Sequence, residues 1–296
     1  MDFQQQLATK ITKIEQILSA YLPPEQGRAR TVLQAMNYSV NAGGKRLRPL
    51  LLAETYTLFG GSEQVAEPFA AAIEMIHTYS LVHDDLPAMD NDEYRRGKKT
   101  THAVFGEAMG ILAGDALLTF AFETAAKGLE LTADATRVAR AMGLLAKKAG
   151  IYGMLGGQVI DVEAEGNQNL TLDQILEIHT LKTGALLEAS MMIGAVLAGA
   201  DEEDMGKLER IARNIGIAFQ IQDDILDLTG TMEELGKPIG SDKRNEKVTY
   251  VTLEGIEKSA KEVKRLSDEA VMLLHSLQKD SEFLEQLILS LVNRRK

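Results

Sequence analysis

The feature that most constrains the fold of this 296-residue chain is the placement of its six prolines, at 23, 24, 49, 68, 87 and 238. The long stretch between Pro87 and Pro238 is rich in Ala, Leu, Met, Glu and Lys and has few β-branched runs, as helices prefer. Short breaks such as "FGGSEQ" and "AGADEED" separate segments of roughly 15–25 residues. We therefore expect an all-α fold, a single large bundle of about ten helices.

Local signals refine this expectation. Thr171 and Ser281 have the character of helix caps, so a helix is predicted to begin at each of them. No hairpin or alternating strand of useful length is predicted. Length alone would suggest two domains, but the chain has no linker, low-complexity tract or repeat. Residues 1–296 are therefore predicted to form one domain.

Composition excludes several classes of protein. The absence of cysteine rules out disulfides and thiolate metal sites. A net charge of −11 argues against nucleic acid as a partner. The first residues lack the apolar stretch of a secretory signal, and the uncharged run 189–200 is too short to cross a bilayer. We expect a cytoplasmic protein with no membrane span.

One acidic cluster lies in "SLVHDDLPAMDNDEYRRGKK", residues 80–99, where carboxylates and a basic cluster follow an apolar segment. On a helix, His77, Ser80 and Asp84 share a face, and Pro87 disturbs the helix just beyond them. A second basic cluster, "GGKRLRP", lies earlier, at 43–49.

Another acidic cluster lies on the helix predicted around 208–228. At about 100° per residue, one narrow stripe holds Gln220, Asp223, Asp224 and Asp227. The other sides are mostly apolar, whereas a surface helix would be polar around most of its back. We therefore expect these acids to face a central cavity of the bundle, where buried carboxylates need cations.

Carboxylates without His or Cys neighbours suit hard cations, above all Mg²⁺, which completes its octahedron with water and phosphate oxygens. Two such clusters with Lys and Arg nearby predict a site that clamps a polyphosphate. A single Asp-Asp-x-x-Asp is more often a solvated helix face or an ion-pair network, and a lone basic segment is mostly surface. The combination of the clusters is what favours function.

These motifs resemble the trans (head-to-tail) isoprenyl diphosphate synthase family, and within it the bacterial farnesyl diphosphate synthases most. "DDLPAMD" at 84–90 resembles the first aspartate-rich motif, and "FQIQDDILD" at 219–227 resembles the second. The segments "GGKRLRP", "RRGKKTTH", "GGQVIDV", "KTGALLEAS" and "GKPIGSD" follow the family order. The resemblance spans roughly residues 40–250 and implies the helical isoprenoid synthase fold.

The resemblance also implies roles for individual residues. Isopentenyl diphosphate, the homoallylic substrate, would be bound through its diphosphate by Lys45, Arg48, His77 and Arg96. Mg²⁺, three ions per active site, would be held by Asp84, Asp90 and Asp223, supported by Asp85, Asp224 and Asp227. The allylic diphosphate would contact Arg95 and the catalytic residues Lys182 and Lys237, while Thr183 and Gln220 would line the reacting carbon. Residues 230–247 are predicted to form a mobile flap that carries Lys237.

Product length follows from the helix before the first motif. Tyr79 and Ser80 lie five and four positions before Asp84, and a bulky aromatic at this depth resembles the floor that stops elongation at fifteen carbons. We therefore predict Mg²⁺-dependent synthesis of farnesyl diphosphate from isopentenyl and allylic (dimethylallyl, then geranyl) diphosphates, by a homodimer as in the family. The main alternative is geranylgeranyl diphosphate synthesis by the same mechanism.

Two remoter alternatives remain. A class I terpene cyclase of the same fold usually replaces the second aspartate motif and uses no second diphosphate. A non-catalytic partner subunit of a synthase would carry a damaged motif. Both motifs are intact here, which speaks against either alternative.

Overall fold

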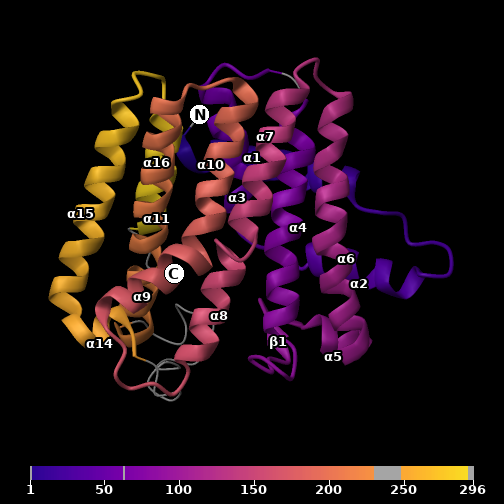
Figure 1. Cartoon of the computed structure of the whole chain (residues 1–296), viewed down its shortest axis with the longest axis horizontal. Helices are drawn as coiled ribbons and strands as arrows, with labels where there is room; N and C mark the ends of the chain where they lie inside the picture. Colours follow the sequence, from indigo (N-terminus) through magenta and orange to yellow (C-terminus); the bar gives the residue numbers. More distant parts are fainter. Residues whose placement is uncertain (1, 63, 230–247, 293–296) are drawn as a thin grey trace. The chain divides into compact units, whose positions relative to one another are not determined.

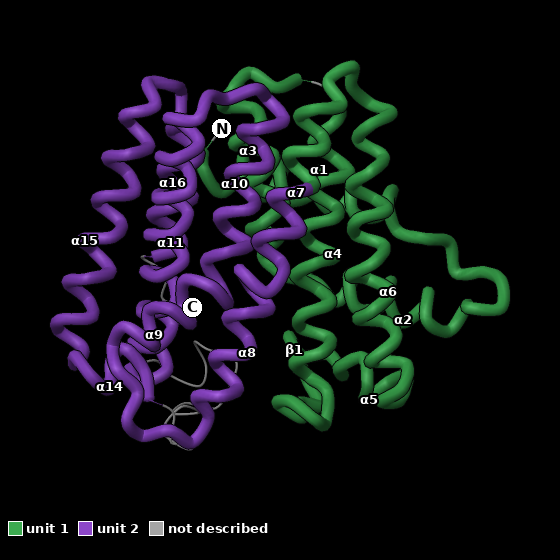
Figure 2. The backbone as a smooth tube through the Cα atoms, viewed as in Figure 1, with its two compact units in different colours: residues 1–142 green, residues 143–296 purple. Residues whose placement is uncertain are grey.

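The computed structural model describes residues 2–62, 64–229 and 248–292, whose regular structure is helical apart from one short hairpin (Figure 1). The predicted all-α fold is confirmed. The chain divides into two compact units, residues 1–142 and 143–296, and each is described by itself (Figure 2). The single domain predicted over residues 1–296 stays a prediction.

The first unit is built around one buried helix, α4. Its elements are α1 (Phe3–Tyr21), α2 (Arg30–Val40), α3 (Leu47–Leu58), α4 (Ala66–Asp84), β1 (Tyr94–Arg95), β2 (Lys98–Lys99), α5 (Thr101–Phe105), α6 (Glu107–Ala126) and the 3₁₀ turn η1 (Lys127–Glu130). Helices α1, α2, α3 and α6 pack against α4, whose residues 69–76 are all buried. A helix that is apolar almost all round requires such enclosure. It ends at Asp84 because the chain reaches Pro87, as predicted.

The next helix along the chain, α7 (Ala135–Ala149), crosses the boundary between the units. The second unit continues with α8 (Met154–Ala164), α9 (Leu172–Ile178), the π-helical η2 (His179–Gly184), α10 (Ala185–Ala198), α11 (Glu202–Thr229), α14 (Tyr250–Glu254), α15 (Ile256–His275) and α16 (Glu282–Val292). The long helix α11 packs against α10, η2 and α15. The predicted helix start at Thr171 is confirmed, since its hydroxyl accepts the Gln174 N–H in a capping box.

The prediction that the chain has no hairpin is wrong for residues 94–99. Tyr94 pairs with Lys99, and Arg95 pairs with Lys98. The two turn residues, Arg96 and Gly97, have φ angles of 54° and 75°. Positive φ at both central residues is the type I′ geometry that a tight hairpin needs. The turn escaped prediction because Arg is not among the residues that normally signal it.

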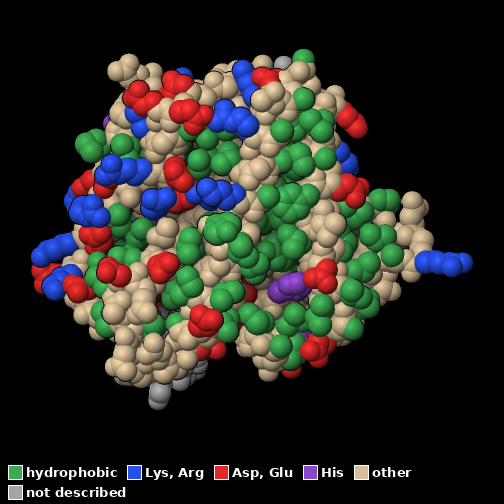
Figure 3. Space-filling view, in the orientation of Figure 1, with side chains coloured by type: hydrophobic (Ala, Val, Ile, Leu, Met, Phe, Trp, Pro, Cys, Tyr) green, Lys and Arg blue, Asp and Glu red, His purple; other side chains and the backbone are tan. Residues whose placement is uncertain are grey.

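Helix α6 exposes an unusually apolar surface. The segment Glu107–Glu130 is long and apolar enough to cross a bilayer by length and composition, and only 39% of its most apolar window is buried. The segment Leu172–Ala198 passes the same test, but 72% of its window is buried, as in a core helix. Figure 3 shows hydrophobic side chains gathered on the face over α6, where Ile111 and Leu112 are exposed. Contiguous exposed apolar surface of this kind is typical of interaction sites.

Candidate active site

In the first unit, cationic side chains gather where the α2–α3 loop, α4 and the hairpin approach one another. Lys45 lies exposed on that loop, whereas Arg48 on α3 is half-buried. The Arg48 Nε is buried and makes no hydrogen bond to any residue that the structure describes. An unpaired buried donor is costly, so this nitrogen is suited to an anionic ligand.

The same neighbourhood keeps His77 neutral. Burial, together with the charges of Arg48, Arg96 and Arg95, holds the pKa of His77 well below its usual 6.5. Burial lowers the pKa of Arg48 to about 10, with Arg96 adding to the effect and Glu74 opposing it. Arg48 is therefore still charged at neutral pH, and the imidazole offers a hydrogen bond rather than a charge.

Arg96 is held to the loop that carries Lys45. Its Nη1 donates to the Gly43 carbonyl, and its guanidinium crosses so close to Gly44 that a Cβ there would lie 2.5 Å from Nη1. Gly44 also has a φ of 141°, which other residues rarely adopt. The small glycines of "GGKRLRP" thus allow the basic cluster at 43–49 to contact the basic cluster at 94–99. The sequence alone did not predict this contact.

The first aspartate motif divides into acids with different surroundings. Asp85 is buried and accepts from the Arg95 Nε at 2.6 Å, which ties the hairpin to the end of α4. Burial raises the pKa of Asp85, and the Arg95 charge opposes that rise. The Asp90 N–H donates to the Asp84 carbonyl at 2.8 Å, so the turn returns the last acid of the motif to the first. The backbones of Asp84 and Asp90 are therefore joined by this turn.

The residues predicted to limit product length lie on α4. Tyr79 is buried and its ring makes an edge contact with His83, with centroids 5.9 Å apart. Ser80 is partly exposed and its hydroxyl donates to the His77 carbonyl at 2.9 Å. Burial, followed by the Asp84 charge, raises the pKa of the Tyr79 phenol, which therefore stays neutral.

In the second unit, the structure brings two of the predicted catalytic residues together. The Thr183 hydroxyl, on the π-helical turn η2, donates to the Gln220 side-chain carbonyl on α11 at 2.8 Å. The backbones approach closely here, since a Cβ on Gly216 would lie 2.9 Å from the Gly184 Cα. π-Helical turns are frequent at functional sites because they redirect side chains and backbone groups.

Lys182 has a partner that the sequence did not single out as a site residue. Its Nζ donates to Asp161 of α8 at 2.6 Å. Asp161 lies in "GGQVIDV", and a Cβ on Gly157 of that segment would collide with the Lys182 backbone nitrogen. The small Gly157 therefore lets α8 lie against η2, so that Asp161 can orient the Lys182 ammonium.

The second aspartate motif lies on α11, where Asp224 and Asp227 are buried and Asp223 is partly exposed. Asp224 accepts from the Tyr250 N–H at 3.2 Å and so joins α11 to the start of α14. Lys237 and the predicted flap 230–247 lie outside the described residues.

Within the described residues, no group of three or more His, Asp or Glu is close enough to hold an ion by itself. Mg²⁺ is commonly held by one or two carboxylates and completes its shell with water and phosphate oxygens, so the aspartates of the two motifs have the chemistry to bind it. The predicted number of ions is untested.

The comparison of sequences decides the family. A profile of the polyprenyl synthetase family matches residues 29–287. The chain belongs to this family. Among similar polyprenyl synthetases, the geranylgeranyl diphosphate synthase of Cyanophora paradoxa is 47% identical over 87% of this chain and 85% of its own length. The farnesyl diphosphate synthase of Geobacillus stearothermophilus is 50% identical over 81% of this chain and 80% of its own length.

A solved structure agrees with this assignment. The FPP/GFPP synthase of Zymomonas mobilis gives a TM-score of 0.87 at 34% identity and covers 98% of both chains. The predicted resemblance is confirmed, and this polyprenyl synthetase is a head-to-tail prenyltransferase. Because its relatives are both farnesyl and geranylgeranyl diphosphate synthases, they leave the product length to be argued from the site.

Proposed function

We propose that this polyprenyl synthetase is a farnesyl diphosphate synthase, which condenses isopentenyl diphosphate first with dimethylallyl and then with geranyl diphosphate. The observation that carries the two-substrate reaction is the cationic pair Arg48 and Arg96 with the neutral His77, where the buried Arg48 Nε makes no hydrogen bond to any described residue. A cyclase binds one diphosphate substrate and does not need a second diphosphate site. A non-catalytic subunit needs neither the homoallylic nor the allylic site. The buried ring of Tyr79 favours a fifteen-carbon product over geranylgeranyl diphosphate.

The residues of the first unit would bind the homoallylic diphosphate. Lys45, Arg48 and Arg96 supply positive charge, and the neutral His77 supplies a hydrogen bond. The allylic diphosphate would contact Arg95, Lys182 and Lys237. Asp85 holds Arg95 and Asp161 holds Lys182, so these cations are oriented before a substrate arrives.

Mg²⁺ would be held by Asp84, Asp90 and Asp223, three ions per site, and when bound it stabilises the negative charge that develops on the departing diphosphate. Asp224 supports this arrangement by fixing the start of α14, and Asp227 by its burial on α11.

The reaction follows from what the chain's own residues can stabilise. The allylic C–O bond breaks, and its electron pair leaves with the diphosphate. The carbocation that remains lies against uncharged dipoles, for which the Thr183 hydroxyl and the Gln220 amide are suited. The double bond of isopentenyl diphosphate forms the new C–C bond, and the proton lost afterwards goes to the released diphosphate. Lys182 stabilises that leaving group, while apolar walls exclude water.

Consumption of isopentenyl diphosphate in the presence of dimethylallyl diphosphate tests this proposal. We expect turnover with Mg²⁺, none in EDTA, and recovery when Mg²⁺ is restored. Asp84→Ala and Asp223→Ala should each reduce kcat by several orders of magnitude, because each removes a carboxylate from a charge-stabilising site. Asp268→Ala, an exposed aspartate paired with Lys264 on α15, is the matched control and should retain activity.

Full turnover in EDTA would refute the metal requirement. Consumption of dimethylallyl diphosphate alone, without isopentenyl diphosphate, would favour a cyclase instead.

We further propose a cytoplasmic homodimer with no membrane span, in which a second copy covers the apolar surface of α6. The support is the exposure of Ile111 and Leu112 on a helix that carries few charges.

A further inference from the structure

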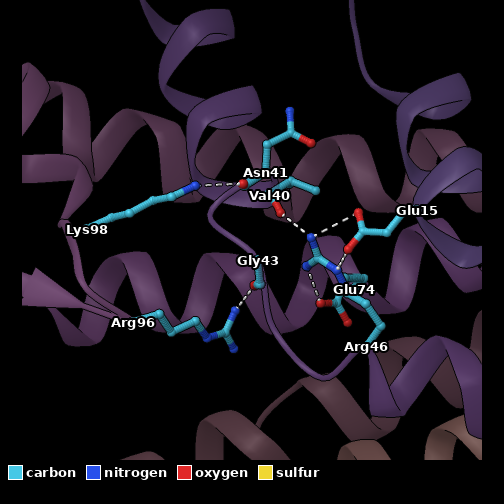
Figure 4. Close-up of polar contacts among 8 residues, drawn as sticks. All are labelled: Glu15, Val40, Asn41, Gly43, Arg46, Glu74, Arg96 and Lys98. Carbon is cyan, nitrogen blue, oxygen red and sulfur yellow. Dashed lines mark hydrogen bonds and ion pairs between the residues drawn. The ribbon is translucent and has the colours of Figure 1, made fainter. Parts of the chain in front are cut away.

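One arginine of "GGKRLRP" is already fully engaged by the protein. The Arg46 side chain is 1% exposed, and its guanidinium makes four hydrogen bonds (Figure 4). Its Nε donates to Glu15 Oε1 at 2.6 Å and its Nη1 to Glu74 Oε1 at 2.8 Å. Its Nη2 donates to the Val40 carbonyl at 2.8 Å and to Glu15 Oε2 at 3.3 Å. Arg46 therefore does not bind substrate, although it lies between Lys45 and Arg48 in the sequence.

The carboxylate of Glu74 is the centre of this network. Glu74 is the single acid of the apolar segment "FAAAIEMI" and is only 2% exposed. Its charge acts on Arg48 and Arg96 as well as on Arg46, and it opposes the fall in the pKa of both. The Glu74 carboxylate therefore interacts electrostatically with three guanidinium groups, and among the described residues it accepts a hydrogen bond from Arg46.

The network also fixes the loop on which substrate-binding groups depend. Arg46 adopts a left-handed conformation with a φ of 48°, which a residue with a side chain rarely holds unless its contacts enforce it. The loop that it ends offers the Asn41 carbonyl to Lys98 at 3.3 Å and the Gly43 carbonyl to Arg96. Anchoring Arg46 to Glu15 and Glu74 therefore also anchors the hairpin to this loop.

We propose that Arg46 is a positioning residue for the homoallylic diphosphate: it occupies the Glu74 carboxylate and fixes the 41–46 loop, so that Arg48 and Arg96 stay available to the substrate. This inference rests on the proposed function. Without Arg46, the buried Glu74 carboxylate would turn to Arg48 and Arg96, because a buried charge must be paired. An internal carboxylate would then compete with the substrate for the same two cations.

The competition predicts opposite effects for the two partners of one ion pair. Arg46→Met should raise the Kd for isopentenyl diphosphate by about tenfold or more, since Glu74 then engages its binding cations. Glu74→Gln should lower that Kd, because it removes the competing charge and keeps an oxygen for Arg46. In the double variant Arg46→Met/Glu74→Gln the Kd should return toward the wild-type value.

Isothermal titration of isopentenyl diphosphate alone, without allylic substrate and without Mg²⁺, measures this directly. Glu188→Gln is the matched control: Glu188 is a carboxylate of the second unit with a 3% exposed side chain, paired with Lys148 and Arg213. It should lower thermal stability as Glu74→Gln does, without changing the Kd. Arg46→Lys, which keeps the charge but not four hydrogen bonds, should raise the Kd less than Arg46→Met and serves if the latter does not fold.

The outcomes separate two failures. If the wild-type protein does not bind isopentenyl diphosphate, the proposed function fails. If the wild-type protein binds but Glu74→Gln weakens binding as the Arg46 variants do, or the double variant shows no recovery, the network is merely structural and the inference is overturned.

Discussion

At the scale of single residues, the proposed homoallylic site depends on side chains whose charge is set by their surroundings. Arg48, Arg96 and His77 lie close together, and the two guanidinium charges keep the imidazole neutral in addition to burial. A neutral imidazole can donate the hydrogen bond of its N–H to a diphosphate oxygen without adding to the charge repulsion among the arginines. The lowered pKa of His77 also reduces the stability of the fold at acidic pH.

His77 makes the free energy of unfolding depend on pH. The folded-state pKa of His77 lies well below the 6.5 of an unfolded histidine, so the unfolded chain binds the extra proton as the pH falls through 6.5. The fold therefore loses stability below that pH and regains it above. Relative to His77→Gln, the wild-type protein should lose about 1.4 kcal/mol of unfolding free energy between pH 7.5 and 5.5.

Urea unfolding of both proteins at the two pH values checks this. Parallel pH dependence of the two proteins would mean that His77 titrates normally in the fold, and its neutral role in substrate binding would then be untenable.

At the scale of elements, the sequence predicts helices well because proline placement and periodicity act locally. The end of α4 at Asp84 and the start of α9 after Thr171 both follow from such signals. The hairpin at 94–99 was missed because its turn residue Arg96 adopts a positive φ that only contacts with other segments support. The π-helical turn at Lys182 was missed for a related reason, since it depends on the close approach of glycines on other helices.

The candidate site shows the same limit. Residue types and motif order were enough to select Thr183 and Gln220, which the structure joins by a hydrogen bond. They could not show that Arg46 is hydrogen-bonded to internal carboxylates while the Arg48 Nε has no hydrogen-bond partner in the described part of the chain, because both are arginines of one short motif. A lone acid in an apolar segment, Glu74, was the available signal, since a buried carboxylate requires a cationic partner.

We predict that helix α6 forms the interface of a homodimer. Its outward residues Ile111 and Leu112 are 42% and 48% exposed, which favours a covering second copy. Leu112→Glu should convert a dimer of twice the 32.4 kDa chain mass into monomers, because a charge would be buried without a partner at the interface. Multi-angle light scattering measures the mass.

Met272→Glu is the control for that variant, since Met272 is 64% exposed on α15, whose surface is covered with ion pairs. It should leave the mass unchanged. A monomeric wild-type protein, or one that pellets with lipid vesicles, would show that the surface of α6 is not a dimer interface.

At the scale of the whole molecule, the proposed reaction uses both aspartate motifs and the cations Arg48 and Arg96, whereas α6 serves the proposed assembly. The family assignment rests on the match over residues 29–287 and establishes the type of chemistry. The product length that we propose depends on α4, where Tyr79 is buried and Ser80 lies four residues, about one helical turn, before Asp84. The proposed floor acts by steric exclusion, so each substitution must change the length of the product in a fixed direction.

The chain length of the product formed from dimethylallyl and isopentenyl diphosphates tests the central claim most directly. The wild-type enzyme should release mainly the fifteen-carbon product, Tyr79→Ala should shift it toward twenty carbons or more, and Ser80→Phe should shift it toward ten. Mass spectrometry of the dephosphorylated products distinguishes the three. A wild-type enzyme that makes mainly the twenty-carbon product, or two variants with the wild-type product distribution, would contradict the assignment of Tyr79 as the floor and of farnesyl diphosphate as the product.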